Sequence, residues 1–363
     1  MTPPALALVE SPAQLLNVLE WALGDRRGAD EGPVAVAVLL PQDEPTRRQL
    51  DAVSTLARSA GLRVSAYEVR GRAAALAGCC ALLAPRLAGA RRLVLGDPFS
   101  RVVQLLLPLS PAAELVLVDD GTATLELSEL LLAGRPLVRW HRGGTGRSPR
   151  AADRTTRRLT PRRGHRLELF TAMSGPLTLP PGTVARSNQY SWARGRFGPP
   201  TVVPLVDLAG CSLVETGLVT AARYVEGVAE LARRRGVSRY LAHRRESPEK
   251  LQQLELAAGI EIVQPRLPLE LAVLTEPIGA TVLSFPSTVL HTLPRILREY
   301  PVEVAACEEI RGWLRHDASA HASDFLRRVT GAGAAADLSP GGPTLGGRTH
   351  SSSHRSGQEA ELT

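Results

Sequence analysis

The sequence of 363 residues contains one lysine, Lys250, so arginine carries nearly all of its positive charge. Aromatic residues make up 4% of the chain, which leaves few rings on which nucleic-acid bases could stack. No apolar run approaches the roughly 18 residues that a membrane-spanning helix needs. No positive charge precedes the first short apolar run, Ala5–Val9, as it would in a signal peptide. We therefore expect a cytoplasmic protein whose partner is not nucleic acid.

Several motifs of known chemistry are also missing. The sequence has no Gly-rich phosphate loop of the G-x-G-x-x-G or Walker type, which weakens a dinucleotide or ATP interpretation. It has no G-x-S-x-G sequence, so a hydrolase nucleophile elbow is unsupported. The cysteines lack the spacing of a metal site, and a cytosolic chain keeps its thiols reduced. We therefore expect the four of them to pack in the core: Cys79, Cys80, Cys211 and Cys307.

What the sequence does contain is a large apolar fraction and a positive charge balance. Hydrophobic residues make up 44% of the chain, which is enough to form sizeable cores. The formal net charge of +7 favours anionic partners, such as a nucleotide, an acidic polymer or an anionic membrane face. The length predicts two or three domains.

Short apolar runs alternate with helical patterns, which is typical of βαβ units and a parallel sheet. In the first third, helical patterns separate five predicted strands, at residues 5–9, 34–40, 62–69, 92–95 and 114–118. In the second half the alternation returns, with strands predicted within residues 199–206 and at 238–241, 260–263, 281–285 and 302–305. The predicted fold class is α/β, with two Rossmann-like domains facing a cleft.

The pattern breaks between residues 139 and 166, which hold ten arginines and a single acidic residue, Asp153. This Arg-rich stretch has two interpretations: a solvated, mobile loop, or a docking surface for an anionic acceptor or an acidic lipid surface. Residues 331–363 are rich in Gly, Ser, Thr and Pro, and we expect them to be disordered. The predicted organisation is an N-terminal domain over 1–138, the Arg-rich loop over 139–166, a C-terminal domain over 167–330, and the tail.

Candidate site residues follow the predicted strands, where open α/β sheets bind their ligands. Asp119-Asp120-Gly121 comes directly after an unbroken apolar strand. It could form a Mg²⁺ site, supply a general base, or simply make a turn that suits Asp and Gly. Two adjacent carboxylates would raise each other's pKa, which would suit one of them for taking a proton from a hydroxyl group.

Three further groups lie in the second half of the chain. His243 heads a basic turn with Arg244, where an imidazolium could donate to a phosphate and protonate a leaving group, although a lone histidine is more often structural. Ser287-Thr288 opens a predicted helix and could form an anion site or only an N-cap. Glu270 also opens a helix, where a carboxylate could hold ribose hydroxyls or only complement the helix dipole.

These motifs resemble those of bacterial sialyltransferases with the double-Rossmann GT-B fold, of the polysialyltransferase and lipooligosaccharide sialyltransferase types. Those families place an acidic-acidic-Gly motif in the N-terminal domain, a His-Pro motif in the C-terminal domain and a Ser-Ser/Thr pair further on. The matching residues stand in the same order here: Asp119-Asp120-Gly121, His243-Arg244 and Ser287-Thr288. The segments 7–14 and 210–217 are also similar to the families' sequences, so the resemblance spans roughly residues 5 to 310.

The resemblance implies a role for each of these residues. Asp119 would be the general base that deprotonates the acceptor hydroxyl, and Asp120 would support it. His243 would contact the phosphate of CMP-sialic acid and assist the departure of CMP. The phosphate would be bound by Ser287 and Thr288, and the ribose by Glu270.

The resemblance also implies a reaction and its partners. Transfer would invert the anomeric carbon by direct displacement, without an obligatory metal or other cofactor. The partners would be a nucleotide-sugar donor and a glycan acceptor, anionic or lipid-linked. A peripheral position at the inner face of the membrane, through the Arg-rich stretch, is a further expectation.

One residue departs from the family pattern, because Arg244 stands where proline is usual. The turn could be shaped differently, or the extra cation could serve a different phosphate pattern, so a related nonulosonic acid or another nucleotide sugar stays open as the donor. Two other functions stay open as well. One is a different nucleotide-sugar enzyme on the same architecture, such as a UDP-sugar transferase or an epimerase. The other is a non-catalytic protein whose Arg-rich stretch binds polyanions.

Overall fold

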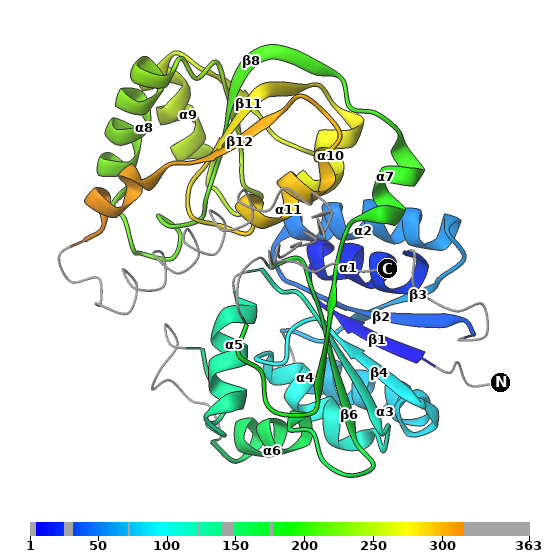
Figure 1. The fold of residues 1–363 in the computed structure, drawn as a ribbon. Helices are drawn as coiled ribbons and strands as arrows, with labels where there is room; N and C mark the ends of the chain where they lie inside the picture. Colours follow the sequence, from blue (N-terminus) through cyan, green and yellow to red (C-terminus); the bar gives the residue numbers. More distant parts are fainter. Residues whose placement is uncertain are drawn as a thin grey trace, which may run out of the picture.

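The computed structural model describes residues 5–24, 32–71, 73–121, 123–139, 149–173 and 177–315, which fold into two α/β units (Figure 1). Each unit is built on a parallel sheet with helices packed on both faces. The first sheet has seven strands and the second has five. The prediction of an α/β protein with two Rossmann-like units is confirmed.

The first sheet has the strand order β3-β2-β1-β4-β5-β6-β7, and every neighbouring pair is parallel. Its strands are β1 (Ala5–Val9), β2 (Val34–Leu40), β3 (Arg63–Glu68), β4 (Arg92–Leu95), β5 (Glu114–Val118), β6 (Arg166–Thr171) and β7 (Thr183–Ser187). Its helices are α1 (Pro12–Leu23), α2 (Glu44–Ser59), α3 (Ala73–Gly89), α4 (Arg101–Leu106), α5 (Ala123–Leu132) and α6 (Pro149–Leu159).

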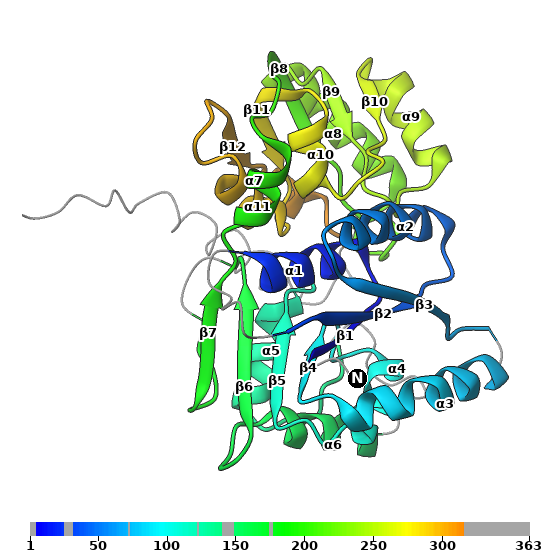
Figure 2. The same cartoon turned by 90° about the vertical axis from the view of Figure 1, so that its right-hand side faces the viewer.

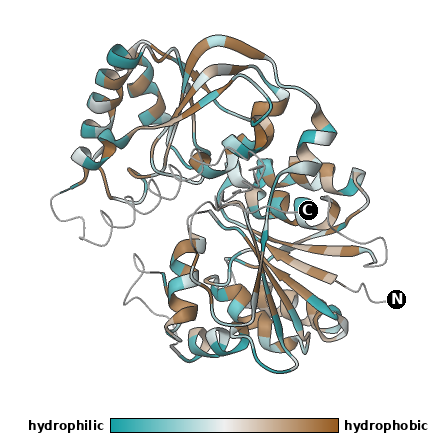
Figure 3. Ribbon diagram, in the orientation of Figure 1, coloured by the Kyte–Doolittle hydropathy of each residue, from teal (hydrophilic) through white to brown (hydrophobic). Residues whose placement is uncertain are grey.

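The apolar strands of this sheet are explained by burial on both faces. Successive side chains of β1 point to opposite faces, so Ala5, Ala7 and Val9 join the core under α1 and α2. Leu6 and Leu8 join the second core, which α3, α4, α5 and α6 cover. Strands buried on both faces read as continuous apolar runs, which are the brown strands of Figure 3.

The second sheet has the order β10-β9-β8-β11-β12, again with parallel neighbours throughout. Its strands are β8 (Val202–Ala209), β9 (Arg239–Leu241), β10 (Glu261–Val263), β11 (Ile278–Ser284) and β12 (Glu303–Ala306). The helices are α7 (Ser191–Phe197), which connects the two sheets, α8 (Ala221–Arg235), α9 (Pro248–Ala258), α10 (Leu269–Thr275) and α11 (Val289–Ile296). The strand order reverses between β1 and β4 in the first sheet and between β8 and β11 in the second.

Helix ends lie where the local sequence predicts them. The Ser11 hydroxyl accepts a hydrogen bond from the backbone N–H of Gln14, with Pro12 at the first helical position of α1. α8 and α9 end at Gly236 and Gly259, whose φ angles of +67° and +64° lie in the left-handed region that glycine adopts readily.

The expected domain boundaries need correction. β6 pairs with β5 and β7 pairs with β6, so the first sheet extends to Ser187 and the expected boundary at residue 167 falls inside it. Much of the Arg-rich stretch that the structure describes is not a loop, because residues 149–159 form α6. Ala152, Thr155, Thr156 and Leu159 form its buried face. Residues 140–148 and the tail over 331–363 lie outside the described residues.

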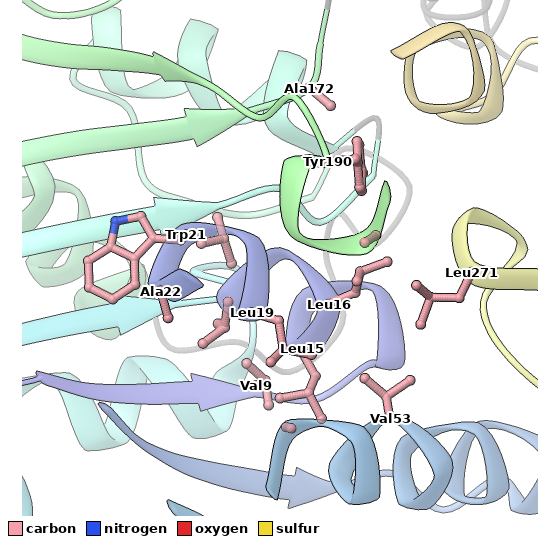
Figure 4. Packing of buried hydrophobic residues seen from close by; sticks show 14 of the residues in the cluster. Val9, Leu15, Leu16, Leu19, Trp21, Ala22, Val53, Ala172, Tyr190 and Leu271 are labelled. Carbon is pink, nitrogen blue, oxygen red and sulfur yellow. The ribbon is translucent and has the colours of Figure 1, made fainter. Parts of the chain in front are cut away.

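The two units share an apolar core on the side that α1 occupies. Figure 2 shows α1 and α2 between the first sheet and the second unit. Figure 4 shows Leu271 of α10 directed toward Leu16 of α1 and Val53 of α2. Among the described residues, no helix is long and apolar enough to cross a membrane.

Hydrogen bonds reinforce the contact between the two units. The Glu20 carboxylate of α1 accepts hydrogen bonds from the backbone N–H groups of Trp192 and Ala193. These N–H groups lie in the first turn of α7, where they have no partner within the helix. The Gln49 amide of α2 donates to the carbonyl oxygens of Pro265 and Leu267 in the second unit. These contacts position the carboxyl ends of the two sheets opposite each other.

Candidate functional site

A cavity of about 1160 Å³ lies between the carboxyl ends of the two sheets. Its walls include segments that follow β1, β4 and β5 of the first sheet and β8, β9 and β11 of the second. This is the crevice at the topological switch points where open α/β sheets bind ligands. Among the predicted site residues, these line it: Asp120, His243, Arg244, Glu270, Ser287 and Thr288. Asp119 does not line it.

Asp119 is buried at the end of β5, with 4% of its surface exposed. One carboxylate oxygen accepts a hydrogen bond from the Thr124 hydroxyl at 2.8 Å, and the other accepts from the Ala172 backbone N–H at 2.5 Å. Burial raises its pKa to about 6, although these hydrogen bonds work in the opposite direction. The side chain therefore ties β5 to α5 and to the end of β6, and it is not part of the cavity wall.

Asp120 is the carboxylate of the pair that reaches the cavity. Its Oδ1 accepts a 2.6 Å hydrogen bond from the Gln14 side-chain amide, and its Oδ2 pairs with the guanidinium of Arg139. Gln14 is itself fixed, because its side-chain oxygen accepts from the Glu10 backbone N–H at 2.7 Å. The Asp-Asp-Gly sequence thus makes a turn and also presents one carboxylate, with Gly121 in the left-handed region at φ +68°.

Arg139 joins Asp120 to a second carboxylate that follows β4. Its guanidinium lies 3.1 Å from Oδ2 of Asp97, and Asp97 also accepts from the Phe99 backbone N–H at 2.8 Å. Burial, followed by the neighbouring charge of Asp120, raises the pKa of Asp97 to about 7. Burial also raises the pKa of Glu10, the third acid on this wall. This wall of the cavity is acidic, and Arg139 neutralises part of its charge.

His243 lies on the opposite wall, at the start of a β-turn. The turn is closed by a 2.9 Å hydrogen bond from the Glu246 backbone N–H to the His243 carbonyl oxygen. The Arg245 backbone N–H donates to Nδ1 of His243 at 3.2 Å, which assigns the ring proton of the neutral form to Nε2. Burial, followed by the charges of Arg244 and Arg245, lowers the pKa of His243 to about 3. The expected imidazolium is therefore absent before a ligand binds.

A buried network beneath this turn contains the chain's single lysine. One oxygen of Glu246 accepts from the His243 backbone N–H at 2.6 Å. The other lies 2.7 Å from Nζ of Lys250 and accepts from the Tyr240 hydroxyl at 2.6 Å. Nζ of Lys250 also donates to the Cys211 carbonyl oxygen and lies 3.3 Å from Glu215. The network connects the His243 turn to the loop after β8, and both segments line the cavity.

The remaining predicted residues occupy the neighbouring edge of the same wall. Ser287 accepts from the Val289 backbone N–H at 3.3 Å, so its hydroxyl lies at the start of α11. Glu270 accepts from the Thr292 hydroxyl at 3.2 Å. A Cβ placed on Gly121 would lie 3.6 Å from the Thr288 methyl group, which is ordinary van der Waals distance. The Asp-Asp-Gly and Ser-Thr motifs, 166 positions apart in the sequence, therefore meet across the cavity.

Within the described ranges, no set of three or more His, Cys, Asp or Glu side chains has the geometry to hold a metal ion. The four cysteines are free thiols, and Cys79, Cys211 and Cys307 are buried as predicted, whereas Cys80 is partly exposed. The carboxylates of the acidic wall are instead stabilised by hydrogen bonds and by Arg139.

The sequence did not single out three residues that shape the site. Asp97 follows a predicted strand just as Asp119 does, so the strand-end rule could have found it. Arg139 was one of ten arginines in a stretch described by its composition. Lys250 was notable only for being unique, and nothing in its local sequence shows that its ammonium group is buried beside Glu246.

No protein-family model matches the chain, and no curated protein sequence matches it. Among solved structures, an α/β-galactoside α-2,3-sialyltransferase from the marine bacterium Photobacterium phosphoreum has a TM-score of 0.46 at 12% identity, covering 90% of this chain and 94% of its own. The Escherichia coli heptosyltransferase WaaC has a TM-score of 0.38 at 13% identity, with 84% and 92% covered. A glycosyltransferase from Rickettsia africae has a TM-score of 0.42 at 9% identity, with 90% and 88% covered. With every TM-score below 0.5, these likenesses do not decide the activity of the chain.

Proposed function

We propose that the protein is an inverting glycosyltransferase of GT-B type that moves sialic acid, or a related nonulosonic acid, from a CMP-activated donor to a hydroxyl group of a glycan. One observation carries the proposal. The three motifs that resemble those of bacterial sialyltransferases line the same cavity, with the Asp120 carboxylate on one wall and the His243 ring and the hydroxyls of Ser287-Thr288 on the other. A displacement reaction needs both groups, because a proton leaves the acceptor as negative charge develops on the departing phosphate.

The donor occupies the wall that the second sheet forms. The Nε2–H of neutral His243 donates to the phosphate of CMP, and the hydroxyls of Ser287 and Thr288 contact the same group at the start of α11. The positive end of the α11 dipole favours an anion at this position. Glu270 binds the ribose hydroxyls, as the resemblance implies.

The acceptor occupies the wall that the first sheet forms. Here the proposal differs from the expectation, because Asp120 rather than Asp119 has access to the cavity. Asp120 takes the proton of the acceptor hydroxyl, and the oxygen attacks the anomeric carbon from the face opposite the phosphate. The bond between that carbon and the phosphate oxygen breaks, its electron pair leaves with CMP, and the configuration inverts. Arg139 and Gln14 orient the carboxylate until the acceptor arrives.

The test is the thermal stability of the wild type and of His243→Ala with CMP, CDP, UDP, GDP and buffer alone. The proposal expects CMP to stabilise the wild type and His243→Ala to lose the effect, since a ligand that binds the folded state raises its stability. A transfer assay with CMP-sialic acid in the presence of EDTA then tests the reaction and its independence of metal.

The other outcomes separate the alternatives. Stabilisation by UDP or GDP without CMP would overturn the donor and leave a different nucleotide-sugar enzyme. If no nucleotide stabilises the protein, and salt-sensitive binding to unrelated polyanions is the only interaction found, the chain is a polyanion-binding protein.

A further inference from the structure

Arg244 occupies a position in the turn where proline would fit. The turn is closed between His243 and Glu246, so Arg244 is its second residue. Proline is favoured at the second position of the common β-turns because its fixed φ suits them. The turn therefore keeps its form without proline, held by the Glu246 side chain that accepts from the His243 backbone N–H. Arg244 in place of the usual proline therefore adds a cation to the cavity and keeps the turn.

This cation has no bound counter-ion within the part of the chain that the structure describes. Arg244 lines the cavity, yet its Nε is buried and has no hydrogen-bond partner. Carboxylates of Glu270, Asp120 and Asp43 lie close enough to favour its charged form, but burial outweighs them and lowers its pKa. By contrast, Arg139 across the cavity pairs with two carboxylates. A half-buried guanidinium whose buried Nε–H is unpaired is a binding group for an anion, because leaving that donor unpaired is unfavourable.

The phosphate of the donor does not need Arg244. His243, Ser287 and Thr288 already supply donors for one phosphate, and the families that the motifs resemble usually have proline where Arg244 stands. Arg244 lines the same cavity as this phosphate site and as Asp120. An anionic group bound there would belong to the part of the donor near the reacting carbon.

We propose that Arg244 binds a second anionic group of the donor, beside the phosphate that His243 and Ser287-Thr288 hold. The inference rests on the proposed function and narrows its substrate class. For a CMP-activated nonulosonic acid the second group is the carboxylate on the anomeric carbon. For a nucleoside diphosphate sugar it is the second phosphate. The planar guanidinium can donate two parallel hydrogen bonds to either group, and that geometry would orient the reacting carbon toward Asp120.

The experiment measures the dissociation constants of CMP, CDP and CMP-sialic acid, without acceptor, for the wild type, Arg244→Pro, Arg244→Gln and Arg244→Lys. Arg244→Pro is the sharpest variant because it removes the cation and suits the turn. The control is Arg266→Gln, which makes the same charge change at an exposed residue between Pro265 and Leu267, both of which line the cavity. Melting curves of the ligand-free variants establish that each one folds.

The wild type is expected to bind CMP-sialic acid roughly 10-fold to 100-fold more tightly than CMP, the range expected for hydrogen bonds to a charged group. Arg244→Pro and Arg244→Gln should abolish this difference and leave the affinity for CMP within about 3-fold of wild type. Arg244→Lys should restore part of it, and Arg266→Gln should keep all of it. If CDP rather than CMP-sialic acid shows the Arg244-dependent gain, the second group is a phosphate.

Two results would overturn the inference about Arg244 and leave the proposed function intact. Either Arg244→Pro weakens CMP and both larger ligands by the same factor, so that Arg244 serves the single phosphate, or it changes none of the three affinities. If the folded wild type binds no nucleotide, the proposed function fails, and the inference fails with it.

Discussion

Asp119 and Asp120 are neighbours in the sequence, but their carboxylates lie in different surroundings. Asp119 is enclosed by Thr124 and the Ala172 backbone N–H, whereas Asp120 borders the cavity and pairs with Arg139. Adjacent residues after a strand point in different directions, so the sequence identifies the pair without identifying its reactive member. The family resemblance named Asp119, and the position of the cavity favours Asp120.

Exchange of each aspartate for asparagine separates the two roles. Asp120→Asn is expected to lower kcat of transfer by about 10²-fold to 10⁴-fold, the usual contribution of a general base, with little change in stability. Asp119→Asn loses an acceptor of a buried hydrogen bond and should lower the free energy of unfolding by roughly 1–3 kcal/mol, with a smaller effect on kcat. Both are measured by steady-state kinetics and urea unfolding. Equal loss of kcat in Asp119→Asn at unchanged stability would return the base role to Asp119.

His243 is predicted to stay neutral across the physiological range in the ligand-free protein. Its pKa of about 3 in the folded state lies below the ordinary value of 6.5, so the unfolded chain binds the proton first as the pH falls. The contribution of His243 to stability is therefore complete above pH 6.5 and is lost as the pH falls toward 3.

Nitrogen-15 NMR of the histidine rings gives the direct measurement for His243. The ring should keep its proton on Nε2 between pH 5 and 8, and bound CMP should raise its pKa because the phosphate favours the charged form. His243→Gln identifies the resonance. A titration midpoint near 6.5 in the ligand-free protein would contradict the prediction.

At the scale of single elements, the turn between β9 and α9 is positioned by a buried ion pair. Lys250 and Glu246 have side chains that are 2% and 0% exposed, and Glu246 also holds the His243 backbone N–H. Lys250→Met should lower the free energy of unfolding by about 3–5 kcal/mol, because Glu246 would be left buried without its cation. The double variant Lys250→Met/Glu246→Gln should regain part of this loss.

Urea unfolding and the affinity for CMP are measured on the same Lys250 and Glu246 variants. The double variant should bind CMP more weakly than wild type even where its stability recovers, because the His243 turn has lost its charged partner. Wild-type affinity in the double variant would show that the pair serves stability alone.

Helix α6 carries a stripe of arginines on the face opposite its buried one. Arg150, Arg154 and Arg157 are exposed and spaced at four and three residues. If this helix docks on an anionic membrane face, Arg150→Gln/Arg154→Gln/Arg157→Gln should weaken binding to phosphatidylglycerol vesicles by about 1 kcal/mol per residue. Vesicle flotation is the measurement, with phosphatidylcholine vesicles as the reference.

The matched control replaces three exposed arginines of α8, namely Arg223, Arg233 and Arg234, each of which pairs with a glutamate. These changes should leave flotation nearly unaltered. Equal losses from both helices, or no flotation of the wild type, would remove α6 as a membrane contact.

α6 also shows which helices and strands could be predicted from the sequence. Its buried residues at 152, 155, 156 and 159 follow the helical period, but the high arginine content led to the prediction of a loop. The strands were predicted well where both faces are buried, as in β1 and β5, because continuous apolar runs mark them. β6 and β7 were not predicted as strands, because Arg166, Glu168 and Arg186 interrupt their apolar residues.

At the scale of the whole molecule, the two units are joined through one apolar core. Leu271 of α10 is fully buried against side chains of α1 and α2. We predict a single unfolding transition in calorimetry for the wild type. Leu271→Ala should lower stability by about 2–5 kcal/mol and separate the transition into two, because it weakens the contact between the units.

Leu254→Ala is the matched control, since Leu254 is equally buried but belongs to the second unit's own core. It should lower the stability of that unit without weakening the core that joins the two. Two transitions in the wild type would show that the shared core does not couple the units.

The placement of the site was predictable at this scale, and its detailed contacts were not. Strand ends of parallel sheets meet at one edge, which is why Asp120, His243 and Ser287 could be assigned to a single cleft from their positions after predicted strands. The pairing of Arg139 with Asp97 and Asp120 depends on side chains brought together from distant segments. No local pattern encodes such a pairing, so it appears only in three dimensions.

The burial of Lys250 has a consequence for covalent chemistry. Reagents that acylate lysine side chains find one target in the chain, and in the folded protein that target is 3% exposed. The surface cations are arginines, which such reagents do not modify. Acylation of Lys250 would therefore require α9 to open away from β9. The acylation rate would then report how often this local opening occurs in the element that positions His243.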